Sequence, residues 1–230
     1  MAIFTNFKAQ KALMLHSKGK YDEAKTIYDE AYAQGMNTAR YLLPYSILLL
    51  RLGDYEKARE VLKKAEKAPG GLTPDQRSQM LTNYAIVSWK TGRIDYAIDL
   101  LREVYRKGVN GTIYGTLGFL LIEKGDFEEA LAFNQEALEY DDEDAVVLDN
   151  LAQTYYRLGN DKAEARKWFK KALEQKESAI DTNYFLALYD IEDGDMDAAR
   201  EKLETAKAGR FSPLNYATPA LIEEALGRLQ

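Results

Sequence analysis

Residues 124–138 read KGDFEEALAFNQEAL, and residues 52–66 read LGDYEKAREVLKKAE. Both stretches place an aromatic residue two positions after a glycine and an alanine five positions after it. A glycine occurs at this place in six copies of the pattern, at Gly19, Gly53, Gly92, Gly125, Gly159 and Gly194. The intervals are 34, 39, 33, 34 and 35 residues. A period near 34 residues predicts an array of stacked supersecondary units.

The residues on both sides of each glycine have helical spacing. In the fourth copy, Tyr114, Leu117 and Leu121 fall on one helix face ahead of Gly125, and Ala130 follows it. A glycine can adopt the left-handed conformation that ends a helix, and small residues let two helix backbones approach closely. Each copy is therefore predicted to be two helices joined by a glycine turn.

The fifth copy departs from this spacing by one residue. Its segment GNDKAEA, residues 159–165, places Ala165 six positions after Gly159 rather than five. We interpret this as a one-residue insertion within the segment, which leaves the helix pair itself intact.

This arrangement resembles the tetratricopeptide repeat family, whose pattern is Trp-x₂-Leu-Gly-x₂-Tyr, then Ala-x₃-Phe, then Pro. In the fifth copy the matching residues are Leu148, Leu151, Ala152, Tyr155, Ala165, Phe169 and Ala172. The family's proline is absent from its expected place in all six copies. The resemblance implies an all-α, right-handed solenoid (superhelix) of about six helix-turn-helix repeats with a C-terminal capping helix.

The repeats are expected to form a single domain over residues 1–230. The predicted repeats are residues 5–38, 39–72, 78–110, 111–144, 145–179 and 180–213, with the capping helix at about 216–229. The loop APGGLTPDQ, residues 68–76, lengthens one interval to 39 residues. Within it, the run Thr73-Pro74-Asp75-Gln76 is typical of a capping box at the start of a helix.

Composition argues against several classes of function. The chain contains no cysteine and a single histidine, His16, so we expect no disulfide, no metal site and no cofactor. The acidic run at 139–144 lacks the ligand spacing and the glycine of an EF-hand loop. No nucleophile is paired with a base in a recognisable pattern, so an enzyme is not predicted.

Targeting signals are also missing from the sequence. The longest uncharged apolar stretch, Tyr41–Leu50, is too short to cross a bilayer, and MAIFTNFKAQ at the start does not read as a signal peptide. A cytoplasmic location is therefore predicted.

Charge is distributed unevenly along the chain. Residues 1–125 hold 19 basic and 13 acidic side chains, a net charge of +6, whereas residues 126–230 hold 12 and 24, a net charge of −12. The acidic half repels phosphate, so nucleic-acid binding is not expected. An alternative function follows from the same numbers, in which copies of the chain form a homo-oligomer by associating head to tail through oppositely charged halves.

The family resemblance implies a protein–protein interaction module that binds a protein or peptide in a concave groove lined by the first helix of each repeat. The groove positions lie three, six and ten residues before each glycine, and in the fifth copy they include Asp149 and Gln153. The residues predicted to contact the partner are Leu43, Ile47, Leu50, Asn83, Ile86, Trp89, Phe119, Ile122 and Tyr156. A mostly apolar lining favours a peptide or an amphipathic partner helix. In the alternative, these side chains pack on one another or are covered by the N-terminal MAIFTNF.

Overall fold

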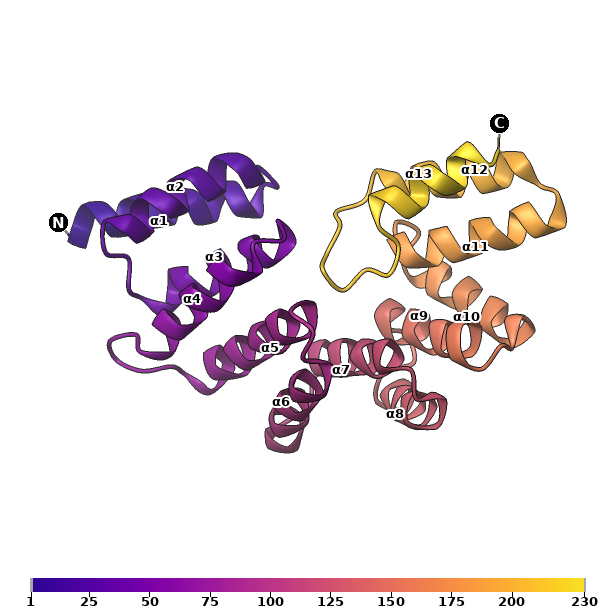
Figure 1. Cartoon of the computed structure of the whole chain (residues 1–230), viewed down its shortest axis with the longest axis horizontal. Coiled ribbons are helices and arrows are strands. Elements are labelled where there is room, and N and C mark those ends of the chain that lie inside the picture. Colours follow the sequence, from indigo (N-terminus) through magenta and orange to yellow (C-terminus); the bar gives the residue numbers. More distant parts are fainter. Residues whose placement is uncertain (1, 230) are drawn as a thin grey trace. The chain divides into compact units, whose positions relative to one another are not determined.

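The computed structural model describes residues 2–229, and within that range every element is a helix (Figure 1). The helices follow one another in pairs, so the predicted all-α architecture of successive helix pairs is confirmed. They fall into two compact units, one ending at Lys107 and the other beginning at Gly108, which we call the N-terminal and C-terminal units. The prediction of one continuous domain stays a prediction.

The N-terminal unit consists of three helix pairs. Its helices are α1 Ala2–Ser17, α2 Tyr21–Ala33, α3 Ala39–Arg51, α4 Tyr55–Glu66, α5 Pro74–Lys90 and α6 Ile94–Lys107. The turns within the pairs contain Gly19, Gly53 and Gly92, each with a φ between 75° and 82° in the left-handed region. Glycine adopts this conformation without steric cost, which explains why it recurs at this position. The predicted capping box at Thr73 and Gln76 is present at the start of α5.

Small and aromatic side chains together fill the interior of this unit. Ala24, Ala31 and Ala58 are fully buried, and their size lets neighbouring helices pack closely. The rings of Tyr28 and Tyr45 stack with their centroids 5.0 Å apart, and fully buried leucines such as Leu48 and Leu62 fill further space. The alternation of small and large residues seen in the sequence therefore corresponds to close packing between helices.

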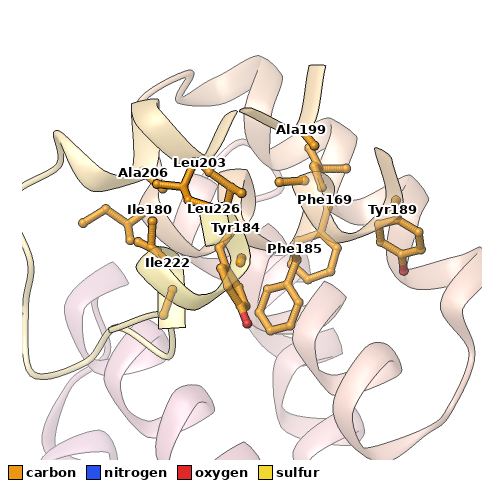
Figure 2. Close-up of a cluster of buried hydrophobic side chains, with 14 of the residues drawn as sticks. Phe169, Ile180, Tyr184, Phe185, Tyr189, Ala199, Leu203, Ala206, Ile222 and Leu226 are labelled. Carbon is orange, nitrogen blue, oxygen red and sulfur yellow. The ribbon is translucent and has the colours of Figure 1, made fainter. Parts of the chain in front are cut away.

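The C-terminal unit consists of three more pairs and a last helix. Its elements are α7 Gly111–Lys124, α8 Phe127–Tyr140, α9 Ala145–Gln153, η1 Thr154–Leu158, α10 Lys162–Gln175, α11 Ile180–Asp193, α12 Met196–Lys207 and α13 Pro219–Gly227. Figure 2 shows a buried cluster in which Phe169 of α10 stacks on Phe185 of α11, with centroids 4.8 Å apart. Ile222 and Leu226 of α13 belong to the same cluster. The last helix thus covers apolar surface of the final pair.

In the fifth copy the structure differs from the sequence interpretation in the place of the extra residue and in the residue that takes the left-handed conformation. The extra residue is not in the turn but in the helix before it, where residues 154–158 form one turn of π-helix, η1. Gly159 is not left-handed, with φ −81°, and Asn160 takes that conformation instead, with φ +50°. Ala165 lies five residues after Asn160, so the spacing of the other copies is restored. Gly159 has a different requirement, because a Cβ there would lie 2.7 Å from the Phe127 ring.

Candidate functional site

A cavity of about 710 Å³ lies in the C-terminal unit. Its walls are the N-terminal parts of α7, α9 and α11, together with the loop that joins α10 to α11 and the loop that joins α12 to α13. We call residues 208–217 of the latter loop the strap (Figure 1). The lining includes three acidic residues, Asp144, Asp149 and Asp181, and two basic ones, Lys176 and Arg210. Its most exposed large apolar side chain is Val146, at 50%.

Asp149 is the centre of a polar network that connects the first helices of three successive pairs. Its carboxylate accepts hydrogen bonds from Thr182 Oγ1 of α11 at 2.6 Å and from Gln153 Nε2 of α9 at 2.7 Å. Arg157 of η1 donates to Gln153 Oε1 at 3.0 Å and to Glu123 Oε1 of α7 at 2.7 Å. The network therefore fixes the relative positions of the helices that form the cavity.

Asp181 holds the strap against α11. Its carboxylate accepts hydrogen bonds from the backbone N–H of Tyr216 at 3.0 Å and of Ala217 at 2.9 Å, and from Asn215 Nδ2 at 3.2 Å. The ring of Tyr216 stacks on Phe185, with centroids 5.1 Å apart. The Arg157 guanidinium also lies 4.2 Å from the centroid of the Tyr216 ring.

The two carboxyl groups are buried and close enough to interact electrostatically. Burial raises the pKa of Asp149, the charge of Asp181 raises it further, and the hydrogen bonds from Thr182 and Gln153 oppose the change. Burial also raises the pKa of Asp181, against the hydrogen bonds from Ala217, Tyr216 and Asn215. Arg157 lowers both pKa values. The cavity wall thus contains two acidic groups that hold protons more tightly than ordinary aspartates.

In the N-terminal unit, the structure packs most of the residues predicted to contact a partner into the interior. Leu43, Leu50 and Ile86 are buried, whereas Ile47 and Trp89 are half-buried. The Lys90 ammonium lies 3.7 Å from the centroid of the Trp89 ring. The residues of MAIFTNF from Ala2 onwards are part of helix α1.

Asn83, which is predicted to contact a partner, and Asn150 of the C-terminal unit both form hydrogen bonds inside the protein. Asn83 Nδ2 of α5 donates to Ser46 Oγ of α3 at 3.1 Å. In the C-terminal unit, Asn150 Nδ2 of α9 likewise donates to the Gly115 carbonyl of α7 at 2.9 Å. Both asparagines thus join the first helices of two successive pairs.

The remaining predicted contacts lie in the C-terminal unit. Phe119 and Ile122 are buried, and Phe119 lines the cavity. Tyr156 is half-buried among aromatic rings, with its centroid 4.9 Å from Phe185 and 5.8 Å from Tyr189. The neighbouring Arg157, not Tyr156, interacts with Gln153.

Sequence reasoning missed Arg157 and the strap. The spacing of Ala165 carries the signal for Arg157. Because the extra residue lies after Gln153, in η1, only the groove position nearest the turn moves when it is counted from Asn160, from Tyr156 to Arg157. Asp149 and Gln153 occupy groove positions but are not among the residues predicted to contact a partner. Asp181 lies outside the counted positions altogether.

Two further features concern metals and membranes. Within residues 2–229, no group of three or more His, Asp and Glu side chains is placed to hold a metal ion. None of the helices in the same range combines the length and the apolar character needed to cross a bilayer.

Comparison with known proteins identifies the repeats. Three segments of the chain match profiles described as tetratricopeptide repeat, over residues 15–71, 46–112 and 109–178. A TPR repeat-containing protein of Dictyostelium discoideum is 29% identical over 170 residues, which is 71% of this chain and 64% of that protein. The chain therefore spans less than two thirds of the length of this relative.

Solved structures share the same architecture. A tetratricopeptide repeat protein from Parabacteroides merdae superposes with a TM-score of 0.75 at 15% identity, covering 98% of this chain and 84% of that one. PilW, a widely conserved type IV pilus biogenesis factor, superposes with a TM-score of 0.67 at 17% identity, covering 98% of both chains. At these identities the likeness concerns the fold alone.

Proposed function

Since the chain belongs to the tetratricopeptide repeat family, whose members are protein-interaction modules, we propose that it is a non-catalytic adaptor that binds a short segment of a partner protein in the cavity of the C-terminal unit. The observation that carries this proposal is the cavity itself. Its volume of about 710 Å³ lies within the range of roughly 300–1,000 Å³ that is typical of ligand pockets. Four segments of the chain, distant in sequence, contribute to its walls.

The lining favours an extended peptide over a whole helix. Two loop segments, residues 176–179 and the strap, line the cavity together with parts of α7, α9 and α11, so it is not a groove along one helix and matches a few residues of extended chain. Val146 offers an apolar contact, and acidic and basic side chains near it can pair with both kinds of charge on a peptide. A few well-placed polar groups among apolar ones are typical of sites that fix a ligand's orientation.

The apolar groove predicted from the sequence enters the proposal in a reduced form. Of its residues in the N-terminal unit, Ile47 and Trp89 are the ones with appreciable exposed surface. We include them as a secondary contact for a partner, since exposed aromatic residues often contribute strongly to association.

The test is a comparison of two variants in a pull-down from lysate of the source cell. Val146→Arg places a long charged side chain in the cavity, and Met196→Arg makes the same change at a similarly exposed residue of α12, which does not line the cavity. We expect a partner that is retained by the wild type and by Met196→Arg but lost with Val146→Arg. Equal retention by all three proteins would contradict binding in the cavity.

A second function, head-to-tail self-assembly, is favoured by one observation. On α1, Phe7 and Met14 are 73% and 47% exposed and lie seven residues apart, so they share a helix face. Lys11 lies between them on the same exposed face. Lys11 on this face suits the acidic surface of a second copy, and Phe7 and Met14 offer it apolar contacts. Light scattering at low and high salt tests this, and a mass constant near 26.1 kDa under both conditions would contradict it.

A further inference from the structure

The strap contributes part of the cavity lining. Six of its residues contribute to the lining, namely Ala208, Gly209, Arg210, Ser212, Leu214 and Asn215. Most of its side chains are only half-buried, and Ala217 is the one strap residue with a fully buried side chain. Segments with little buried apolar surface are the ones that open most easily from a folded structure.

The strap contains its own hydrogen bonds. The backbone N–H of Ser212 donates to Asn215 Oδ1 at 2.8 Å, and the N–H of Asn215 donates to the Ser212 carbonyl at 3.0 Å. The N–H of Leu214 donates to Ser212 Oγ at 3.2 Å, and Pro213 stiffens the same turn. Because these bonds lie within the segment, the turn keeps them if the strap moves as a unit.

Apolar packing of Tyr216 and Ala217 also holds the strap, but its hydrogen bonds to α11 converge on one carboxylate. All three hydrogen bonds described above for residues 215–217 go to Asp181, two of them from consecutive backbone N–H groups. A carboxylate can accept three donors at once, whereas an amide of the same shape has a single acceptor oxygen. The attachment therefore depends on the carboxylate in particular and not only on the shape of the side chain.

We propose that the strap is a movable wall of the cavity and that Asp181 is the latch that holds it closed. Opening the strap exposes the floor of the cavity formed by α7, α9 and α11 and gives a partner segment access to it. The second half of this statement rests on the proposed function, whereas the latch itself does not.

The latch is tested by hydrogen exchange and limited trypsin cleavage of the full chain without any partner. Asp181→Asn keeps the shape of the side chain and removes the charge. The matched control is Asp190→Asn on the same helix, where the carboxylate pairs with Lys202 at 2.7 Å and does not contact the strap. Both variants change the net charge equally.

In Asp181→Asn we expect the amides of Tyr216 and Ala217 to exchange about tenfold faster or more, since charge-assisted hydrogen bonds are lost. Cleavage after Arg210 accelerates by a similar factor, and the amides of α7 and α9 keep their protection. Asp190→Asn leaves the strap as protected as in the wild type. Unchanged protection at Tyr216 and Ala217 in Asp181→Asn would overturn the proposal. So would a uniform loss of protection across the whole C-terminal unit, because it would show general destabilisation instead of local opening.

The outcome is independent of the pull-down. A strap that opens in Asp181→Asn while Val146→Arg retains every partner supports the latch and removes the cavity as the binding site. A strap that stays closed in Asp181→Asn while Val146→Arg loses a partner supports the cavity as the binding site and removes Asp181 as the latch.

Discussion

The two units repeat the same helix pair but use the first helix of each pair differently. The N-terminal unit, through Lys107, has 18 basic and 12 acidic side chains, whereas the C-terminal unit has 13 and 25. In the N-terminal unit the groove positions ten and six residues before the turn glycine of α3 hold Leu43, which is buried, and Ile47, which is half-buried. In the C-terminal unit the corresponding positions of α9 hold Asp149 and Gln153, which join a polar network beside a cavity.

This difference separates the residues that build the fold from those that give each unit its surface. The glycine and alanine positions are occupied alike in both units, except that Asn160 replaces the turn glycine of the fifth pair, and they determine how helices approach. Groove positions tolerate both leucine and aspartate, so they are the ones free to specify a partner. A repeat protein can therefore keep one architecture while different repeats take different roles.

The largest expected effect tests whether the two units are separate in stability. Phe169→Ala removes a fully buried ring from the cluster of the C-terminal unit, and such changes typically cost about 3–5 kcal/mol. We expect hydrogen exchange to show lost protection in residues 108–229 and much smaller changes up to Lys107. Tyr45→Ala, at a fully buried ring of the N-terminal unit, should give the reverse pattern. Equal loss in both units after either change would show a single cooperative structure.

The next prediction concerns pH, to which the two units should respond in opposite directions. Burial raises the pKa of Asp149 and Asp181, so the folded C-terminal unit binds protons that the unfolded chain releases above its ordinary aspartate pKa of about 3.9. Its stability therefore falls as pH rises from about 4 through the raised values, by about 1.4 kcal/mol for each unit of pKa change.

Asp29 of the N-terminal unit has the opposite behaviour. Burial acts to raise its pKa, but hydrogen bonds from Lys25, at 2.8 Å, and from Tyr45 outweigh burial and lower it. Its contribution to stability is present above pH of about 4 and is lost as pH falls through the lowered pKa. The effect is smaller than that of the buried pair, because Asp29 is partly exposed and solvent screens the interaction.

The two tryptophans allow this prediction to be measured unit by unit. Trp89 lies in α5 and Trp168 in α10, so Trp89→Phe reports on the C-terminal unit and Trp168→Phe on the N-terminal unit. Urea unfolding followed by fluorescence between pH 3 and pH 8 gives the two stabilities. Adding Asp149→Asn to Trp89→Phe should flatten the pH dependence of the C-terminal unit. If the stability of both units changed with pH in the same direction, the attribution of the pH dependence to Asp149, Asp181 and Asp29 would be wrong.

The fold could be predicted from the sequence because its determinants are local and periodic. Each left-handed glycine and each small residue five positions later serves one turn and one helix contact, so a count along the chain finds them. The capping box at Thr73 was visible for the same reason.

The site could be predicted only in part because it depends on contacts between distant segments. Leu43 and Trp89 both occupy groove positions of a first helix, yet Leu43 is buried and Trp89 is half-buried. The packing of neighbouring helices sets this difference in burial. Asp181 contacts strap residues 34 to 36 positions away along the chain. No periodic pattern encodes such a contact.

The smallest expected effect concerns the one pair whose turn differs from the others. Asn160 has φ +50°, a conformation that costs a non-glycine residue some steric energy. Asn160→Gly relieves this cost but makes the unfolded chain more flexible, so we expect a net gain of about 0.5 kcal/mol in the stability of the C-terminal unit. Gly125→Asn, at the left-handed turn of the preceding pair, should lose a similar amount, since a Cβ there has nothing within 4 Å and only the backbone is affected. If both substitutions were to shift the urea midpoint in the same direction, the left-handed conformation would not be what separates the two turns.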